Sequence, residues 1–307
     1  MIEISIISPV YKAEKIVDKL VQSIVESVSV ITPNYEIILI EDGGPDNSWS
    51  KIEENCKNNT LVKGLKLSRN FGQHFAITAG LIEAKGNYVI VMDCDLQDNP
   101  IYIKELYEKA KMGFDIVYTI KKERNHSWFK NLTSAIFFKI FNYLTDNQTA
   151  SSSIGSYSML SRKVVNAFCQ IKDTHRHYLM VLRTLGFSSA NISIIHEKRY
   201  EGKSSYNLSK LVKHALDGIT SQSDKLLRIS ISVGFMFCGI SIALVIYTVI
   251  KYIIVGALPG YTSLTSIILL STGLILLSIG IAGMYIGKIF EQVKGRPLYF
   301  IDKKINF

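Results

Sequence analysis

Two long stretches without charged residues constrain the fold of this chain more than any other feature. Residues 229–250 form a run of 22 residues with no charged side chain, and residues 263–287 form a run of 25. A helix needs about 20 apolar residues to cross the hydrocarbon core of a bilayer, so each run is long enough to span it. The alternative is a pair of buried core helices, which the length and closeness of the two runs disfavour. Because the linker between them is short, we expect a transmembrane hairpin at 229–287.

The basic residues around the two runs predict how the hairpin is oriented. Lys225 and Arg228 precede the first run, and Lys251 lies between the runs. The basic residues that follow the second run are Lys288, Lys294, Arg296, Lys303 and Lys304. Since positive charge is retained on the cytoplasmic side, we expect a multi-pass protein with both termini and the large N-terminal region in the cytoplasm.

Two further stretches have the pattern of helices that lie on a membrane surface. Residues 127–145 carry an apolar stripe at helical spacing, and residues 207–228 carry a weaker one. Core-packed helices would give the same pattern, but a chain that is already anchored favours docking on the lipid bilayer. The net charge of +9 also suggests an acidic partner. Nucleic acid is disfavoured, because the basic residues are not interleaved with aromatic side chains in a binding platform.

The N-terminal region has the pattern of an α/β domain. Apolar, β-branched stretches recur at residues 3–11, 35–42, 62–68, 88–95 and 115–120. Between them, helical spacing of apolar residues occurs at 16–28, 73–84 and 101–111. Strands that alternate with helices form a mostly parallel sheet, and ligands of such sheets bind at the carboxyl ends of the strands.

Acidic residues follow the fourth expected strand. The stretch VIVMDCDLQDNP, at residues 89–100, runs from four apolar residues into Asp93, Asp95 and Asp98. Residues two apart on a strand point the same way, so Asp93 and Asp95 can share one ligand while Cys94 faces the core. Carboxylates that converge repel one another unless a cation lies between them. Oxygen ligands of this kind suit Mg²⁺ or Mn²⁺.

Other classes of site have no support in the sequence. There is no GxxxxGK[ST] phosphate loop and no GxGxxG dinucleotide motif. The four cysteines are scattered without zinc or disulfide spacing, and the N-terminus does not resemble a signal peptide. His74, His175 and His177 show no metal-ligand spacing, so we expect structural or surface roles for them.

Several motifs together resemble one enzyme family. They are SPVY at 8–11, EDGGPDNS at 41–48, the long LSRNFGQHF…MDCDLQDNP segment at 67–100, RYEGKSSYNLSKL at 199–211 and KGRPLY at 294–299. They are similar to the motifs of family 2 glycosyltransferases that charge polyprenyl phosphate, such as bactoprenol-phosphate glucosyltransferases and dolichol-phosphate mannose synthase. The resemblance covers nearly the whole chain. It implies a GT-A fold, a nucleotide-sugar donor and a divalent metal ion.

The resemblance also implies roles for particular residues. The metal ligands it implies are Asp93, Asp95 and Gln97. The donor-binding residues it implies are Pro9, Tyr11, Glu14, Asp42, Arg69, Asp93 and Asp95. The residues it implies for the acceptor phosphate are Arg124, Arg199, Lys203 and Ser204. Of these, the expected catalytic residues are Asp93, Asp95, Arg124 and Arg199.

The sequence departs from the family pattern in two places. The usual PxYNEE is replaced by residues 9–14, in which Lys12 and Ala13 stand in place of Asn and Glu. Glu14 is the candidate substitute for base recognition. The usual GDFRLLDRKVV is replaced by GSYSMLSRKVV at 155–165, so that Ser156 and Ser158 replace an acid and an arginine. A lipid phosphate is largely dianionic near neutral pH, so it can attack without a side-chain base.

Together these features predict domain limits. We expect a glycosyltransferase domain at 1–206, an amphipathic juxtamembrane helix at 207–228, the hairpin at 229–287 and a cytoplasmic tail at 288–307. The predicted reaction is inverting sugar transfer to undecaprenyl phosphate at the cytoplasmic face of a bacterial inner membrane. From the resemblance alone the default donor is UDP-glucose, and a homo-oligomer is expected.

Other functions remain open at this point. One alternative is mannose transfer from GDP-mannose to a polyprenyl phosphate, and another is a membrane subunit that binds nucleotide sugars without catalysis. A processive polysaccharide synthase is disfavoured, because the chain has neither a QxxRW-type motif nor further spans.

Overall fold

The computed structural model describes residues 2–121, 143–144, 154–174, 176–195, 223–255 and 260–307. The chain divides into two compact units. The first contains the described residues up to 121 together with those in 154–195 and 297–307. The second contains residues 143–144 and those in 223–296.

A mostly parallel sheet forms the centre of the first unit. Its described strands lie in the order β7-β5-β6-β4-β1-β2-β3-β8. The bounds are β1 Ile4–Val10, β2 Tyr35–Glu41, β3 Val62–Leu67, β4 Tyr88–Val91, β5 Ile116–Lys121, β6 Ile154–Ser161, β7 Ser189–Ile194 and β8 Ile301–Ile305. The central strands β4, β1, β2 and β3 are all parallel to one another, whereas β6 runs antiparallel between β4 and β5. The expected α/β class is confirmed.

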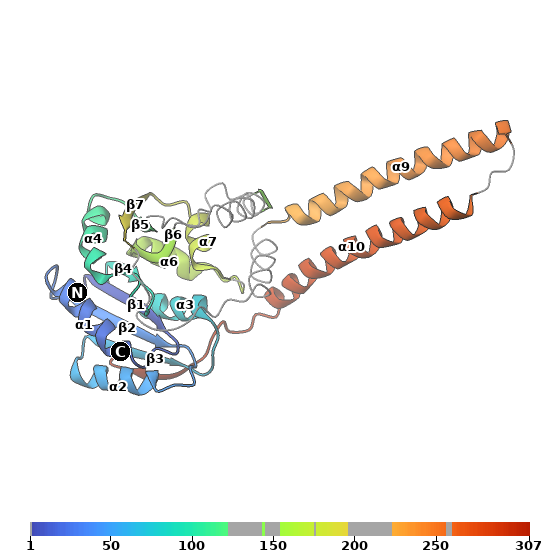
Figure 1. Ribbon diagram of the computed structural model, residues 1–307. Coiled ribbons are helices and arrows are strands. Elements are labelled where there is room, and N and C mark those ends of the chain that lie inside the picture. Colours follow the sequence, from blue (N-terminus) through green and yellow to red (C-terminus); the bar gives the residue numbers. More distant parts are fainter. Residues whose placement is uncertain (1, 122–142, 145–153, 175, 196–222, 256–259) are drawn as a thin grey trace. The chain divides into compact units, whose positions relative to one another are not determined.

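Helices cover both faces of this sheet (Figure 1). Their bounds are α1 Val17–Ser29, α2 Ser48–Asn58, α3 Gln73–Glu83, η1 Pro100–Tyr102, α4 Ile103–Lys111, α6 Arg162–Gln170 and α7 Tyr178–Thr184. Helix α1 illustrates why these helices pack on the sheet. Its apolar residues recur every three or four positions and face the sheet, with Leu20 and Ile24 fully buried. Two-sided cover explains why β1 and β2 are buried along their full lengths.

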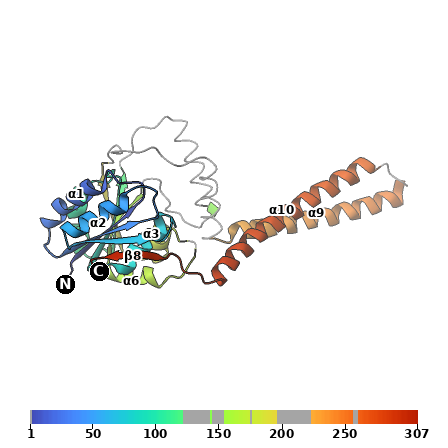
Figure 2. The same ribbon diagram turned by 90° about the horizontal axis from the view of Figure 1, so that it is seen from below.

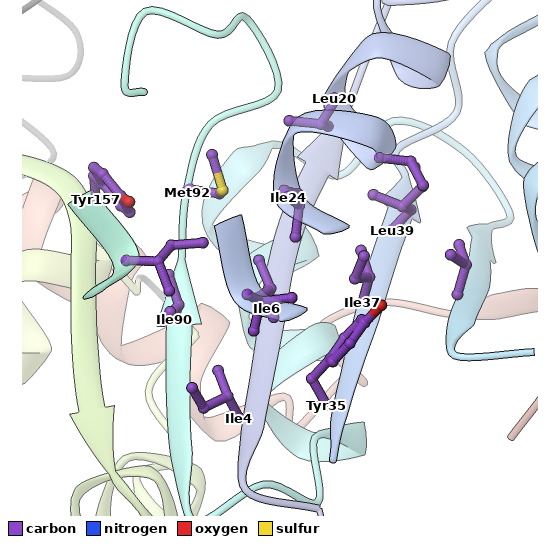
Figure 3. Packing of buried hydrophobic residues seen from close by; sticks show 14 of the residues in the cluster. Ile4, Ile6, Leu20, Ile24, Tyr35, Ile37, Leu39, Ile90, Met92 and Tyr157 are labelled. Carbon is purple, nitrogen blue, oxygen red and sulfur yellow. The ribbon is translucent and has the colours of Figure 1, made fainter. Parts of the chain in front are cut away.

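Alternate residues of the strands supply two separate hydrophobic cores. On β2, Ile37 and Leu39 pack in one core with Leu20 and Ile24 of α1 (Figure 3). The intervening residues Ile38 and Ile40 belong to the other core, which includes residues of α3, α6 and α7. The period of two along each strand therefore fixes which helices each strand residue contacts.

The last residues of the chain return to the sheet of the first unit. Strand β8 lies beside β3 and pairs antiparallel with it (Figure 2). Lys304 Nζ lies 2.6 Å from Glu83 Oε1 of α3. The Asn306 side chain donates hydrogen bonds of 2.8 Å to the carbonyl oxygens of Cys56 and Val62. The sequence analysis expected only a tail here, and β8 gives that tail a structural role at an otherwise open sheet edge.

The second unit consists mainly of two long helices. They are α9, Lys225–Val255, and α10, Tyr261–Val293, and the hydroxyl of Tyr285 on α10 donates to the Ser223 carbonyl oxygen at 2.8 Å, just before α9. In the described part of the chain one segment, Leu270–Val293, is long and apolar enough to cross a membrane. Its mean hydropathy is 1.8. One candidate segment is found where two spans were expected, so the two-span hairpin remains a prediction.

Strands β6, β7 and β8 were missed by the sequence analysis. The pattern of β7 explains one omission, because its side chains alternate between exposed and buried without a strongly apolar run. Strand β4 is also shorter than expected: it ends at Val91 instead of continuing through Asp95. The difference at β4 changes how the acidic residues are presented.

A buried ion pair lies where β2 and β3 adjoin. Lys63 Nζ is 2.6 Å from Glu36 Oε2, and the two side chains are 10% and 1% exposed. Burial raises the pKa of Glu36, but hydrogen bonds from Lys63, the Ser5 hydroxyl and the Lys85 amide outweigh it, so that the pKa is lowered. The carboxylate is therefore favoured in the folded protein, and the stability it provides is lost as the pH falls below the ordinary value of 4.5.

The substitution Lys63→Met should strongly destabilise the protein, because it leaves a buried carboxylate without its cation. We expect a loss of about 3–5 kcal/mol, or a decrease of roughly 10 °C in the unfolding midpoint of the detergent-solubilised protein. Lys51→Met is the matched control, since the Lys51 ion pairs with Asp18 and Glu54 are exposed and should contribute little. Equal midpoints for the two variants would contradict this account.

Candidate active site

The carboxyl ends of the central strands meet at one edge of the sheet. The amide of Asp42, just after β2, donates to the Val10 carbonyl oxygen at 3.0 Å. The amide of Met92, just after β4, donates to the Ile7 carbonyl oxygen at 3.0 Å. These backbone bonds extend the sheet pairing by one residue on each side of β1. They bring the loops that follow β1, β2 and β4 together, as ligand sites in parallel sheets require.

Asp93 and Asp95 both lie beyond the end of a strand, Asp93 just before a turn and Asp95 within it. Strand β4 stops at Val91, and Leu96 adopts a left-handed backbone conformation with φ of 57°. The Asp95 carboxylate accepts a 3.1 Å hydrogen bond from the Gln97 amide, which closes this turn. The expectation that alternation along a strand aligns the two acids is therefore wrong, because the strand has already ended. Asp93 is held at this edge by side chains of neighbouring elements, and the tight turn that follows places Asp95 there.

The residues between and after these acids face the protein interior. Cys94 packs against the hydrophobic core as expected, and burial, together with the charge of Asp93, raises the pKa of its thiol to about 12. A backbone hydrogen bond from Tyr11 opposes that shift, so the turn also contacts the end of β1. Asp98 is 1% exposed and therefore lies beneath the turn. Of the three acids, Asp93 and Asp95 are the accessible pair.

Two neutral donors hold the Asp93 carboxylate. Gln73 Nε2, at the first residue of α3, donates to Asp93 Oδ1 at 2.6 Å. The hydroxyl of Ser156 on β6 donates to the same oxygen at 3.1 Å. The sequence analysis noted Ser156 as a departure from the family pattern and did not single out Gln73. Nothing in the sequence alone places either side chain beside Asp93.

Asp42 organises the loop that follows β3. Its two carboxylate oxygens accept hydrogen bonds from the amides of Phe71 and Gly72 at 2.7 and 2.8 Å. Burial raises the pKa of Asp42, while these two bonds and the charge of Arg69 act in the opposite direction. The side chain that was expected to contact the donor base is thus engaged in supporting the 68–72 loop.

The other expected donor-binding residues surround the same edge. Pro9 is buried within β1, whereas Tyr11 is 44% exposed and Lys12 Nζ lies 5.4 Å from its ring centre. The Glu14 carboxylate accepts hydrogen bonds of 3.2 Å from the amide and the side chain of Asn47. Tyr11 is therefore the member of this group that offers an open aromatic surface to a ligand.

Arg69 lies in the loop that Asp42 supports. Its guanidinium carbon is 4.2 Å from the ring centre of Phe71, and one of its terminal nitrogens donates to the Asn70 carbonyl oxygen at 3.3 Å. The residue is exposed. A cation held against an aromatic ring and open to solvent is well placed to meet an anionic ligand.

The residues expected to bind the acceptor phosphate are not tested by the structure. Arg124, Arg199, Lys203 and Ser204 lie outside the described residues. Their roles remain predictions.

Two further contacts near the site were not predicted from the sequence, although His74, His177 and Ser158 were considered there. The rings of His74 and His177 lie 4.2 Å apart, and the Tyr178 amide donates to His74 Nδ1 at 3.4 Å. The hydroxyls of Ser158 and Tyr178 share a 2.7 Å hydrogen bond inside the protein. Histidines that looked isolated in the sequence become neighbours because α3 and α7 cover the same face of the sheet.

The chemistry of the site suits a hard divalent cation. In the described part of the chain no group of three or more His, Cys, Asp and Glu side chains is arranged to hold a metal ion. Asp93 and Asp95 nevertheless supply carboxylate oxygens from one turn, and Mg²⁺ commonly uses one or two carboxylates with substrate phosphates and water. A site of this kind is completed when an anionic ligand binds, so the residues fit Mg²⁺ or Mn²⁺.

The fold and the strand-end site define a class. The α/β domain carries acids after its fourth strand and an exposed aromatic residue after its first, as expected for a glycosyltransferase of the family that the sequence resembles. Comparison with known proteins gives the family: residues 5–168 match Glycosyl transferase family 2. The chain belongs to this family and is a glycosyltransferase.

The relatives cover the chain almost completely. A glycosyltransferase of Synechocystis sp. is 35% identical over 303 residues, which cover 98% of this chain and 95% of the relative. The undecaprenyl-phosphate 4-deoxy-4-formamido-L-arabinose transferase of Proteus mirabilis is 31% identical over 313 residues, with 99% and 94% covered. Among solved structures, glucosyl-3-phosphoglycerate synthase of Mycobacterium tuberculosis, in complex with Mn²⁺, UDP and phosphoglyceric acid, is similar. Its TM-score is 0.52 at 14% identity, over 71% of this chain and 76% of that one, which shows a shared GT-A-like fold.

The substitution Gly43→Ala should weaken donor binding through the backbone. Gly43 has φ of +59°, and an added Cβ would lie 2.2 Å from the carbonyl carbon of Arg69 and from the amide nitrogen of Asn70. The 68–72 loop would have to move, so we expect nucleotide affinity, measured by isothermal titration calorimetry, to fall by roughly ten-fold or more.

The control for this variant is Gly113→Ala. Gly113 also has positive φ, +101°, but an added Cβ would meet nothing within 4 Å. This variant should lose a little stability and keep its nucleotide affinity. Unchanged affinity in Gly43→Ala would show that the loop position does not control donor binding.

Proposed function

We propose that this protein transfers a sugar, with inversion, from a nucleotide-sugar donor to polyprenyl phosphate, with undecaprenyl phosphate as the expected acceptor. The observation that carries the proposal is the similarity, along 99% of this chain, to an undecaprenyl-phosphate sugar transferase of Proteus mirabilis. Where the family pattern places a carboxylate, the group on β6 that faces Asp93 is the hydroxyl of Ser156, which donates to it. Without that acid as a base, the acceptor has to arrive already ionised. A phosphate monoester meets this need, because its second pKa is about 6.

The chemical step is a single in-line displacement. A phosphate oxygen of the acceptor attacks the anomeric carbon, the bond from that carbon to the donor diphosphate breaks, and the nucleoside diphosphate leaves with the bonding electrons. No proton has to be removed from a dianionic acceptor during this step. The main obstacle is the repulsion between two anionic reactants, so charge stabilisation is the principal task of the site.

Different residues of this chain would stabilise the charges of the donor and of the acceptor. Asp93 and Asp95 would hold a divalent ion, which when bound would neutralise charge on the donor diphosphate. The 68–72 loop, fixed by Asp42, presents Arg69 to the same anionic region. Arg124, Arg199, Lys203 and Ser204 are proposed to bind the acceptor phosphate, and Gln97 is proposed to complete the metal site.

The identity of the donor is proposed on similarity. Tyr11 offers an open ring for stacking of a nucleotide base, and Pro9 and Glu14 are proposed to support that pocket. UDP-glucose is the default donor, and GDP-mannose is the alternative. A non-catalytic subunit that binds nucleotide sugars is the remaining alternative, and it would bind donor without transferring sugar.

Membrane attachment would bring the site to its acceptor. The phosphate end of a polyprenyl phosphate lies at the headgroup plane, and the segment Leu270–Val293 is apolar enough to anchor the chain. We propose a two-span hairpin at 229–287 in the bacterial inner membrane, with the catalytic domain and both termini cytoplasmic. A homo-oligomer is also proposed.

The substitution Asp95→Ala should abolish sugar transfer to undecaprenyl phosphate without unfolding the protein. The carboxylate lies in the turn at the site, and no described strand depends on it. Glycolipid formed from a panel of nucleotide sugars would be measured by mass spectrometry, with Asp302→Ala on exposed β8 as the control. Normal turnover in Asp95→Ala would refute the metal role, and donor binding without product from any donor would favour the non-catalytic alternative.

The proposed topology predicts the behaviour of two fusions. Green fluorescent protein fused after Phe307 should fluoresce, because that end is proposed to be cytoplasmic. Alkaline phosphatase fused after Gly260, in the linker between the helices, should be active, because it would be exported. An inactive phosphatase fusion at normal expression would contradict the two-span hairpin.

A further inference from the structure

We infer that Gln73 and Ser156 are positioning residues that orient the Asp93 carboxylate for binding of a divalent metal ion. The inference rests on the proposed role of Asp93 as a metal ligand. It identifies the two side chains that would support this role, Gln73 on α3 and Ser156 on β6.

The sheet register places Ser156 opposite Asp93. Strands β4 and β6 are antiparallel, with Val89 paired to Leu160 and Val91 paired to Ser158. Continuing the same register by two residues sets position 93 against position 156. The 3.1 Å hydrogen bond from the Ser156 hydroxyl to Asp93 Oδ1 shows that this alignment continues beyond the end of β4. Thus β6 extends past its neighbour and holds the first residues of the turn.

Gln73 approaches the same oxygen from another element. It is the first residue of α3, and it follows Gly72, whose φ of +104° turns the chain into the helix. The Gly72 amide is bonded to Asp42, so the start of α3 is anchored to the end of β2. The 2.6 Å bond from Gln73 Nε2 to Asp93 Oδ1 therefore links Asp93 to the 68–72 loop through a fixed backbone.

Two donors on one carboxylate oxygen fix the plane of the carboxyl group. The terminal torsion of aspartate is broad, and these two bonds narrow its range in Asp93. Holding the group before the metal ion arrives reduces the entropy lost on binding, and side chains that orient metal ligands commonly contribute 10–100-fold to metal affinity. Both donors are neutral, so they orient the acid without supplying a competing positive charge.

Isosteric substitutions of the purified full-length protein in detergent can test this role. Ser156→Val removes the hydroxyl while keeping a similar shape, and Ser156→Thr retains it. Gln73→Met removes the amide while keeping its length. We expect the Kd for Mn²⁺, measured by electron paramagnetic resonance with and without UDP, to rise roughly ten-fold in Ser156→Val and in Gln73→Met. Ser156→Thr should bind Mn²⁺ as the wild type does.

The matched control is Ser161→Val, at the other end of β6. The Ser161 hydroxyl also donates to an aspartate, Asp115, at 3.3 Å, but at a position remote from the site. This variant should keep the wild-type affinity for Mn²⁺. Activity provides a second measurement: excess Mn²⁺ should restore transfer in Ser156→Val, whereas a merely structural defect would not respond to metal.

The outcomes separate the inference from the proposed function. Loss of Mn²⁺ affinity in Asp93→Asn, with normal affinity in Ser156→Val and Gln73→Met, would overturn the positioning role and leave the metal site intact. Tighter Mn²⁺ binding in those two variants would also overturn it, because the donors would then compete with the ion. Unchanged Mn²⁺ binding in Asp93→Asn, or no binding by the wild type, would overturn both claims.

Discussion

The structure depends on the parallel pairing of β1 with its two neighbours, β2 and β4. Each of these strands is followed by a loop that contains candidate site residues, and the pairing places all three loops at one edge of the sheet. Backbone bonds from the Asp42 and Met92 amides to β1 continue the pairing to the point where the loops begin. A parallel arrangement requires a helix between successive strands, so residues far apart in the chain meet here.

The second feature of the site is the set of hydrogen bonds that hold its carboxylates. The described acids are held by neutral or backbone donors: Asp42 by two amides, Asp93 by Gln73 and Ser156, and Asp95 by the Gln97 amide. These hydrogen bonds hold the carboxylates at the edge of the sheet where a divalent ion is proposed to bind. The proposed reaction joins two phosphate-bearing reactants and therefore needs that ion's positive charge.

The C-terminal strand gives the fold a feature that a simple division into domain, spans and tail does not anticipate. Residues beyond α10 belong to the same compact unit as the sheet, and β8 covers the edge of β3. The Ser68 amide, at the start of the 68–72 loop, donates to the Phe300 carbonyl oxygen at 2.9 Å. The chain therefore leaves the first unit and returns to it, and its end supports the loop that carries Arg69.

The sequence by itself determined the α/β class, the five N-terminal strands and the cluster of acids after the fourth, because periodicity and strand-end polarity are local properties. Family motifs supplied the candidate donor-binding residues, whose roles remain predictions. Tertiary structure decided what faces those residues. Ser156 lies 63 positions from Asp93 and meets it only through the antiparallel register of β6, which sequence periodicity does not encode. The end of β4 at Val91, the His74–His177 contact and the return of β8 also depend on packing between distant segments, so no local pattern could have specified them.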